Sequence, residues 1–166
     1  MDIRPTMIHE TADVHPDARI GEGTQVWNNV QIREGAVIGK NCNIGSGVYI
    51  GVGVYIGNNC KILNNAMLFE GLAVNDGVFI GPGACFCNDK YPRAVDTYGE
   101  LLSYGGPETG YTRVLSLAVI GANATILPGL LIGYGSVIGA GAVVTKDTVS
   151  GMLCVGNPAK EVGNAY

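Results

Sequence analysis

The residues best suited to chemistry gather in one polar stretch, Cys87–Arg113, near the middle of the 166-residue chain. The stretch reads CNDKYPRAVDTYGELLSYGGPETGYTR and contains the cations Lys90, Arg93 and Arg113, four acidic residues and four tyrosines. Cations bind anionic groups, and a long polar loop that leaves a regular repeat is more often functional than not. We therefore expect this stretch to carry part of a binding or catalytic site. The alternative is a loop that packs in an oligomer or is merely tolerated.

Histidine, a frequent general base and metal ligand, is almost absent. His9 and His15 are the only two, and both stand near the start of the chain. Two early histidines cannot build a three-histidine zinc site, so a metal hydratase is excluded and no metal is expected. His15 precedes Pro16 at a predicted turn, where a structural role is expected; the alternative is a place in a substrate site of a neighbouring subunit.

The five cysteines form no CxxC pair and no metal-ligand spacing. Their odd number favours reduced, mostly buried thiols in a cytoplasmic protein. Many short glycine-rich fragments occur, but the chain has no G-x-x-x-x-G-K-[ST] phosphate-binding motif. The net charge of −4 and the lack of a Lys/Arg cluster make nucleic acid an unlikely partner.

A six-residue repeat must position these groups. From Val14 onward every sixth residue is apolar, and the thirteen positions are Val14, Ile20, Val26, Ile32, Ile38, Ile44, Ile50, Ile56, Ile62, Leu68, Val74, Ile80 and Phe86. A period of six fits neither an α-helix nor a simple alternating strand. Three hexads make one coil of about 18 residues with three short strands, and successive coils stack at about 4.8 Å. The pattern predicts an all-β, parallel β-helix.

The repeat pauses after Phe86, resumes at Val114 and continues to Val144. We therefore expect a single domain over residues 1–166, with coils at 14–86 and 114–149, an inserted loop at about 87–113 and a C-terminal segment at 150–166. This amounts to a little over six coils, with residues 1–13 capping the open end. The uncharged run 114–145 is long enough to span a bilayer, but it keeps the six-residue period, so we expect it to form β-helix wall. Met1–Glu10 lacks the apolar segment of a signal peptide.

The pattern resembles the hexapeptide-repeat acyltransferases, whose fold is a left-handed parallel β-helix. The segments FCNDKYPRA (86–94), HPDARIGEGTQVW (15–27), KILNNAMLFEG (61–71) and GNPAK (156–160) narrow the resemblance. They are similar to N-acetyltransferases that acetylate the 3-amino group of UDP-linked aminouronates or dTDP-linked 3-amino-3,6-dideoxyhexoses. The similarity spans nearly the whole chain. It implies acetyl-CoA as donor, a homotrimer with active sites between subunits, and products used in bacterial surface polysaccharides.

The resemblance implies that Asn88, at the loop root, holds the acceptor near the thioester. An amine needs positioning and a route for its proton more than it needs a strong base. Asparagine cannot accept that proton, so Glu70 or Asp89 is the titratable candidate, and the departing CoA sulfur is a third acceptor. Asp89, Lys90, Tyr91 and Arg93 are the expected contacts to the diphosphate or nucleoside.

For the donor, the resemblance places pantetheine beside the later coils. Ala122 and Ala140 stand at turns where a small side chain permits close approach, while Lys146 and Lys160 are the only cations after Arg113. The segment GNPAK, with Asn157 and Pro158, is similar to the family's terminal CoA loop. The alternative for the two lysines is a role in solubility alone.

The resemblance thus implies acetyl transfer from acetyl-CoA to the amino group of a nucleotide-linked sugar. An O-acetyltransferase of the same fold is the second hypothesis, although a hydroxyl needs a base more than an amine does. A non-catalytic β-helical scaffold is the third. The sequence leaves open whether the nucleotide is UDP or dTDP.

Overall fold

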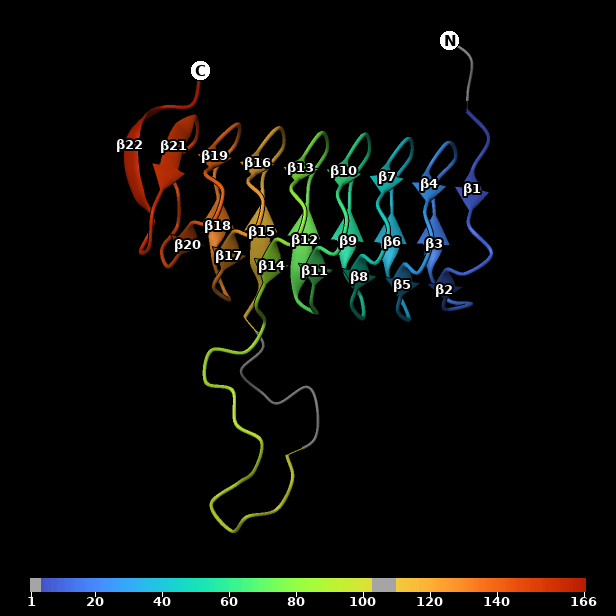
Figure 1. The fold of residues 1–166 in the computed structure, drawn as a ribbon, viewed down its shortest axis with the longest axis horizontal. Coiled ribbons are helices and arrows are strands. Elements are labelled where there is room, and N and C mark those ends of the chain that lie inside the picture. Colours follow the sequence, from blue (N-terminus) through green and yellow to red (C-terminus); the bar gives the residue numbers. More distant parts are fainter. Residues whose placement is uncertain (1–3, 103–109) are drawn as a thin grey trace.

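The computed structural model describes residues 4–102 and 110–166, and β-strands are the regular elements in these ranges. The strands wind into a prism with three walls, each wall a sheet of parallel strands apart from one antiparallel strand at the C-terminal end (Figure 1). The all-β prediction is confirmed, and the architecture is a left-handed parallel β-helix. Residues 103–109 of the inserted loop, Tyr104 among them, lie outside the described ranges.

The first wall, sheet A, has nine strands. In spatial order they are β1 (Met7–Ile8), β4 (Gln25–Val26), β7 (Asn43–Ile44), β10 (Lys61–Ile62), β13 (Phe79–Ile80), β16 (Val119–Ile120), β19 (Val137–Ile138), β21 (Met152–Val155) and β22 (Lys160–Asn164).

The second wall, sheet B, has seven strands: β2 (Asp13–Val14), β5 (Gln31–Ile32), β8 (Tyr49–Ile50), β11 (Met67–Leu68), β14 (Cys85–Phe86), β17 (Thr125–Ile126) and β20 (Val143–Val144). The third wall, sheet C, has six: β3 (Arg19–Ile20), β6 (Val37–Ile38), β9 (Tyr55–Ile56), β12 (Leu72–Val74), β15 (Thr112–Val114) and β18 (Leu131–Ile132).

The strand register confirms the 18-residue coil. Met7 pairs with Gln25, and Tyr49 pairs with Met67, each 18 positions further along the chain. Across the inserted loop the step is longer, because Ala73 pairs with Arg113, 40 positions on. The insertion therefore adds 22 residues to one coil and leaves the stacking of the walls unchanged.

The core is the column of residues inside the prism. In the strands from β4 to β20 the residue of the six-residue series points inward, and Ile32, Ile50 and Phe86 are each no more than 1% exposed. Small residues four positions later, such as Ala36 and Cys60, fill the bends. Full burial of one such aliphatic side chain contributes about 1.5–3 kcal/mol, so the repeat itself supplies the stabilisation of each coil.

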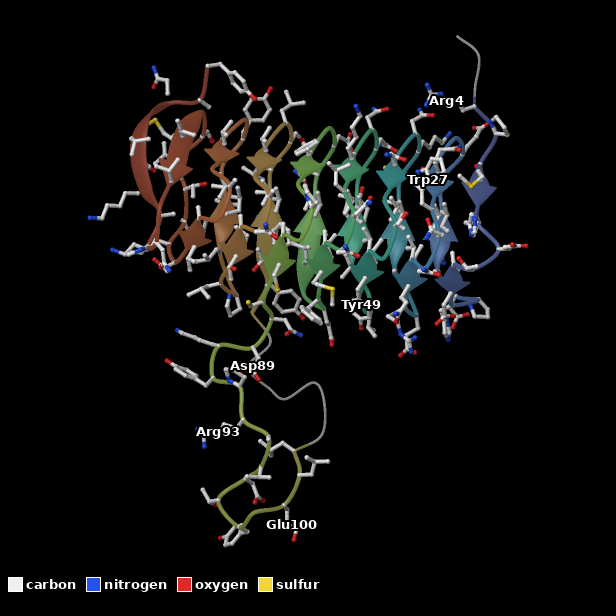
Figure 2. The ribbon with its side chains drawn as sticks, in the orientation of Figure 1. Arg4, Trp27, Tyr49, Asp89, Arg93 and Glu100 are labelled. Atoms are coloured by element: carbon white, nitrogen blue, oxygen red, sulfur yellow. The ribbon has the colours of Figure 1, made fainter. Side chains whose placement is uncertain are left out.

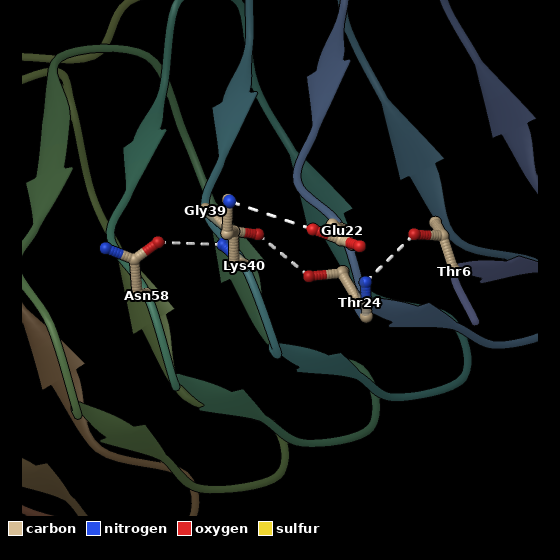
Figure 3. Close-up of polar contacts among 7 residues, drawn as sticks. Thr6, Glu22, Thr24, Gly39, Lys40 and Asn58 are labelled. Atoms are coloured by element: carbon tan, nitrogen blue, oxygen red, sulfur yellow. Dashed lines mark hydrogen bonds and ion pairs between the residues drawn. The ribbon is translucent and has the colours of Figure 1, made fainter. Parts of the chain in front are cut away.

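Polar contacts tie neighbouring coils together at the corners (Figure 3). The Thr24 hydroxyl donates to the Gly39 carbonyl at 2.8 Å, and the Asn58 Oδ1 accepts from the Lys40 backbone N–H at 2.8 Å. The Lys40 ammonium also lies 3.7 Å from a Glu22 carboxylate oxygen. The two hydrogen bonds satisfy backbone groups at the corners, and the ion pair joins two side chains on adjacent coils.

The second turn residue of many corners adopts a positive φ, which favours Gly and Asn. Asn41, Asn65 and Asn123 have φ near 55–59°, and the side-chain oxygen of each lies over a glycine of the preceding coil. Leu117 occupies the same kind of position with φ 62°, above Gly77. Leucine is disfavoured there, because its Cβ approaches the following carbonyl.

Replacing Leu117 with asparagine is expected to stabilise the protein by about 1 kcal/mol, the scale of a relieved left-handed leucine. Thermal unfolding should then shift upward by about 2–4 °C for a chain of this size. The matched control is Leu127→Asn, since Leu127 is also exposed but is not among the positive-φ residues. An equal shift in both variants would contradict the conformational explanation.

Both ends of the β-helix extend beyond the predicted coils. Residues 7–8 form β1 in register with β4, and β21 adds a further parallel strand beside β19. The prediction that the chain leaves the prism near Val149 is therefore wrong. The hexad pattern missed β21 because Val137 pairs with Leu153, only 16 positions on. Within that strand Cys154 takes the inward position and is 2% exposed.

The uncharged run 114–145 forms wall, as predicted, and contributes to strands β15–β20. Across residues 4–102 and 110–166 we find no helix with the length and hydropathy needed to cross a bilayer.

Candidate active site

The inserted loop leaves the prism at the corner between sheets B and C. It begins after β14 and returns at β15, and the Gly110 N–H donates to the Asn88 carbonyl at 3.0 Å. This bond closes the loop at its root. Beyond the root the loop projects away from the walls as an arm (Figure 1).

Glu70 and Asn88 meet at this corner. Leu68 and Phe86 are paired in sheet B. Glu70 lies two residues after Leu68, and Asn88 lies two residues after Phe86. They therefore occupy the same corner position on adjacent coils, roughly 5 Å apart along the axis. Both residues are half-buried. The structure thus brings together the two predicted catalytic residues, whose roles remain predictions.

The wall beside this corner is apolar. Tyr49 of β8 and Phe69, which follows β11, have ring centroids 5.4 Å apart. Cys85 lies on the same wall, where burial and the neighbouring Cys87 raise its pKa to about 11. At neutral pH Cys85 is therefore a thiol rather than a thiolate, which makes it a poor nucleophile. All five cysteines are free, and Cys42, Cys60 and Cys154 are buried, as predicted.

The four predicted acceptor-binding residues lie in the inserted loop and are all exposed. Figure 2 shows two of them, Asp89 and Arg93, on the arm. An Asp89 carboxylate oxygen accepts a hydrogen bond from the Tyr91 N–H at 2.8 Å, so this side chain helps to shape the arm. The Lys90 ammonium lies 5.6 Å from the centre of the Tyr91 ring, a cation–π distance. Arg93 follows two residues later.

A second site lies at the C-terminal end of the same corner. A cavity of about 310 Å³ is lined by Val144, Thr145, Lys146, Asp147, Thr148, Cys154, Pro158, Ala159, Lys160 and Glu161. Three of the predicted donor-binding residues, Lys146, Pro158 and Lys160, are thus brought together. Asn157 is exposed beside them and is not part of the lining.

The cavity is lined by two lysines and two acidic residues, and the lysines are the groups that can bind an anion. An Asp147 oxygen accepts from the Leu131 N–H at 2.9 Å, and a Glu161 oxygen accepts from the Val149 N–H at 3.1 Å. Both acids are therefore engaged with backbone donors. Lys146 and Lys160 form no ion pair with any described residue, and both are exposed. Their ammonium groups remain available for phosphate.

The cavity and the loop root share one edge of the prism. Phe86 pairs with Ile126, which pairs with Val144, so Asn88 and Lys146 occupy equivalent positions two coils apart. At the spacing of paired strands this is roughly 10 Å along the axis. Leu127 and Pro128 stand on the intervening coil.

Ala122 and Ala140 lie on a different edge, the corner between sheets A and B. They are stacked on adjacent coils, where the Gly141 N–H donates to the Ala122 carbonyl at 2.8 Å. The structure therefore does not bring them to the two lysines within one chain. The two edges flank sheet B on opposite sides.

Sequence reasoning missed the part of the cavity that β21 and β22 create. These strands pair antiparallel with an irregular register at Leu153/Cys154, and their pairing brings Ala159 and Glu161 against Thr145–Thr148. The GNPAK segment was the only sequence signal for this part of the cavity. It indicated a terminal loop but not how that loop folds. No group of three His, Cys, Asp or Glu side chains that could hold a metal occurs in the described part of the chain.

Comparison with known proteins agrees with the repeat. A model for the bacterial transferase hexapeptide (six repeats) matches residues 6–51, and one for the hexapeptide repeat of succinyl-transferase matches residues 35–70 and 118–146. A Schizosaccharomyces pombe protein named as a candidate acetyltransferase is 36% identical over 91 residues, which is 55% of this chain and 42% of that protein.

Two solved structures are similar over nearly the whole chain. The acetyltransferase domain of PglB from Neisseria gonorrhoeae is 26% identical to this chain, with a TM-score of 0.60. The match covers 96% of this chain and 58% of the PglB chain. PerB from Caulobacter crescentus, solved with CoA and GDP-perosamine, is 25% identical to this chain, with a TM-score of 0.54. The match covers 97% of this chain and 58% of the PerB chain.

The two hexapeptide models together span more than half of the chain, and the fold is the one they describe. The chain belongs to the hexapeptide-repeat acetyltransferases. It spans less than half the length of the S. pombe protein and under three fifths of the two solved chains.

Proposed function

We propose that this protein transfers the acetyl group of acetyl-CoA to the 3-amino group of a dTDP- or UDP-linked amino sugar. One observation carries the proposal. The insertion that contains FCNDKYPRA opens at a corner where Asn88 lies beside Glu70, and the same edge leads two coils on to a cavity with two unpaired lysines.

Acetyl transfer to an amine needs few groups. The neutral amine attacks the thioester carbonyl, the C–S bond breaks, and the amine loses a proton. Asn88 holds the acceptor by its amide, which contributes through positioning. Glu70, on the adjacent coil, accepts the proton, and the CoA thiolate is the alternative acceptor. Backbone N–H groups at the corner polarise the carbonyl.

The donor then lies along the edge between sheets B and C. Lys146 and Lys160 bind the CoA phosphates, and the pantetheine arm passes Pro128 and the apolar Leu127, which is 36% exposed. Ala122 and Ala140 belong to this site only in a homotrimer, in which a neighbour's edge between sheets A and B faces this one. The trimer, with sites between subunits, is therefore part of the proposal.

The two similar structures support the donor and the class of acceptor. PglB's domain was also solved with acetyl coenzyme A, and PerB with CoA and GDP-perosamine, a nucleotide-linked sugar. We further propose a cytoplasmic enzyme whose product feeds surface polysaccharide synthesis, with no metal in the reaction. Five free cysteines agree with a reducing compartment.

The alternatives predict different behaviour. An O-acetyltransferase needs a base for the hydroxyl, yet His9 and His15 lie in the first coils, four coils from Asn88. A scaffold would need neither the insertion nor the lysine cavity.

The test is release of CoA thiol from acetyl-CoA, followed with a free-thiol reagent against a small panel. The panel contains a UDP-linked 3-amino uronate, a dTDP-linked 3-amino-3,6-dideoxyhexose, GDP-perosamine, serine and a simple galactoside. Turnover with a UDP- or dTDP-linked 3-amine alone would support the proposal and identify the nucleotide. Turnover with the galactoside would favour O-acetylation, and silence without CoA binding would favour the scaffold.

Replacing Lys160 with alanine is expected to raise the KM for acetyl-CoA by about tenfold, the scale of one lost charge-assisted contact, with little change in kcat. Lys61→Ala is the matched control, because Lys61 is also exposed but lies on sheet A. Steady-state kinetics at fixed acceptor measure both constants. An unchanged KM in the Lys160 variant would dismiss the phosphate role.

A further inference from the structure

The outer surface of sheet C carries a polar and aromatic column next to the candidate active site. Tyr55, Ala73 and Arg113 lie side by side on the adjacent strands β9, β12 and β15. Their chain neighbours Ile56, Val74 and Val114 are fully buried, so alternation along each strand turns these three outward. Tyr55 is 46% exposed, and Arg113 is also exposed.

This column stands beside the loop root. Arg113 lies three residues after Gly110, whose N–H donates to the Asn88 carbonyl. Ala73 lies three residues after Glu70. The arginine backbone is held on both sides, since β15 pairs with β12 and with β18. Arg113 is thus a cation whose backbone is fixed in the wall, in contrast to Arg93 on the projecting arm (Figure 2).

Two features leave this arginine open to a ligand. Its side chain forms no ion pair and no hydrogen bond with the residues of 4–102 and 110–166, while its backbone N–H donates to the Leu130 carbonyl. The residue beside it, Ala73, carries only a methyl group, so no bulky side chain stands between Arg113 and Tyr55. With strands about 4.8 Å apart, the two lie roughly 10 Å from each other along the axis.

We propose that Arg113 binds the diphosphate of the nucleotide-linked acceptor, with Tyr55 stacking on its base and Ala73 leaving room between them. The inference rests on the proposed function and deepens it by assigning acceptor specificity to the wall as well as the arm. A guanidinium binds two phosphate oxygens at once through its planar fork. An aromatic face stacks on a base whatever its identity. A contact that is already ordered also costs less on binding.

The test compares Arg113→Gln with Arg19→Gln. Arg19 is the matched control, because it is an exposed arginine facing outward on the same sheet, on β3, four strands away. Calorimetry measures the Kd of UDP and of dTDP, and steady-state kinetics measure the KM of the acceptor. We expect Arg113→Gln to weaken both by about tenfold or more, with the Kd of acetyl-CoA unchanged and Arg19→Gln like wild type.

A second pair of variants tests the room at Ala73 without removing a charge. Ala73→Leu should weaken nucleotide binding by a similar factor, whereas Val37→Leu, one strand beyond Tyr55 in the same column, should not. The Ala73 pair decides the question should Arg113→Gln fail to fold.

The outcomes separate this inference from the proposed function. A wild-type protein that acetylates a nucleotide-linked amine, with Kd and KM unchanged in both the Arg113 and Ala73 variants, would overturn the inference alone. A wild-type protein that neither binds nucleoside diphosphate nor acetylates such an amine would refute the proposed function, and the inference with it.

Discussion

Asn88→Ala is expected to lower kcat at least tenfold while the protein keeps its fold. Asn88 lies at the loop root beside Glu70, and its backbone carbonyl, which accepts from Gly110, is retained in the variant. Only the side-chain amide is lost, so the root should stay closed. The loss of one positioning contact at a reacting centre costs about this much or more.

The measurement is kcat and KM for both substrates with the acceptor found in the panel. Asn64→Ala is the control, because Asn64 is an exposed asparagine at a corner between sheets A and B. Near-normal turnover in Asn88→Ala would remove this residue from the site. Glu70→Gln separates the proton acceptors: lost turnover would favour the carboxylate, and retained turnover the CoA thiolate.

Removing the insertion is expected to abolish activity and leave the β-helix intact. Asn88 and Gly110 occupy the same register position, so deleting residues 89–110 restores the six-residue spacing between Phe86 and Val114. In the deletion variant Tyr111 becomes the second residue of the turn. In other coils this position is occupied by Gly35, Gly53 and Gly129, each with a positive φ, so the variant also carries Tyr111→Gly. Each coil keeps its inward aliphatic residues.

We expect a fall in turnover of about a hundredfold or more, since the deletion removes the proposed acceptor contacts of the arm. The midpoint of thermal unfolding should stay within a few degrees of wild type, because closing a loop of this length costs only a few kcal/mol. Full-length Tyr111→Gly is the control. Retained turnover would show that the loop is dispensable and would contradict its proposed role in binding the acceptor. An unfolded deletion variant would contradict the register argument.

The hexads determined the architecture because the signal is local. Each aliphatic residue of the series from Val14 to Phe86 identifies one inward position, and burial of that column is the main source of stability. The resumption at Val114 likewise located the insertion and the wall at 114–145. Beyond the last hexad the method failed at β21, where the step shortens to 16 residues and the inward position is taken by Cys154.

Site residues were harder to group. Asn88, Lys146 and Lys160 could be selected by type and resemblance, yet their common edge, and the separate edge of Ala122 and Ala140, emerged only from the strand pairing. Arg113 was visible as a cation of the inserted loop, but its place on the wall beside Ala73 and Tyr55 was not.

The sequence by itself therefore determined that this chain is a β-helix with one functional insertion, because a period of six separates inward from outward residues. Which edge of the prism each outward residue occupies was decided by the tertiary structure. The three walls share one hexad pattern, so the pattern does not show on which edge an outward residue lies. That assignment needs the register of every coil, including the coil with the 22 added residues, and the terminal β21–β22 pairing.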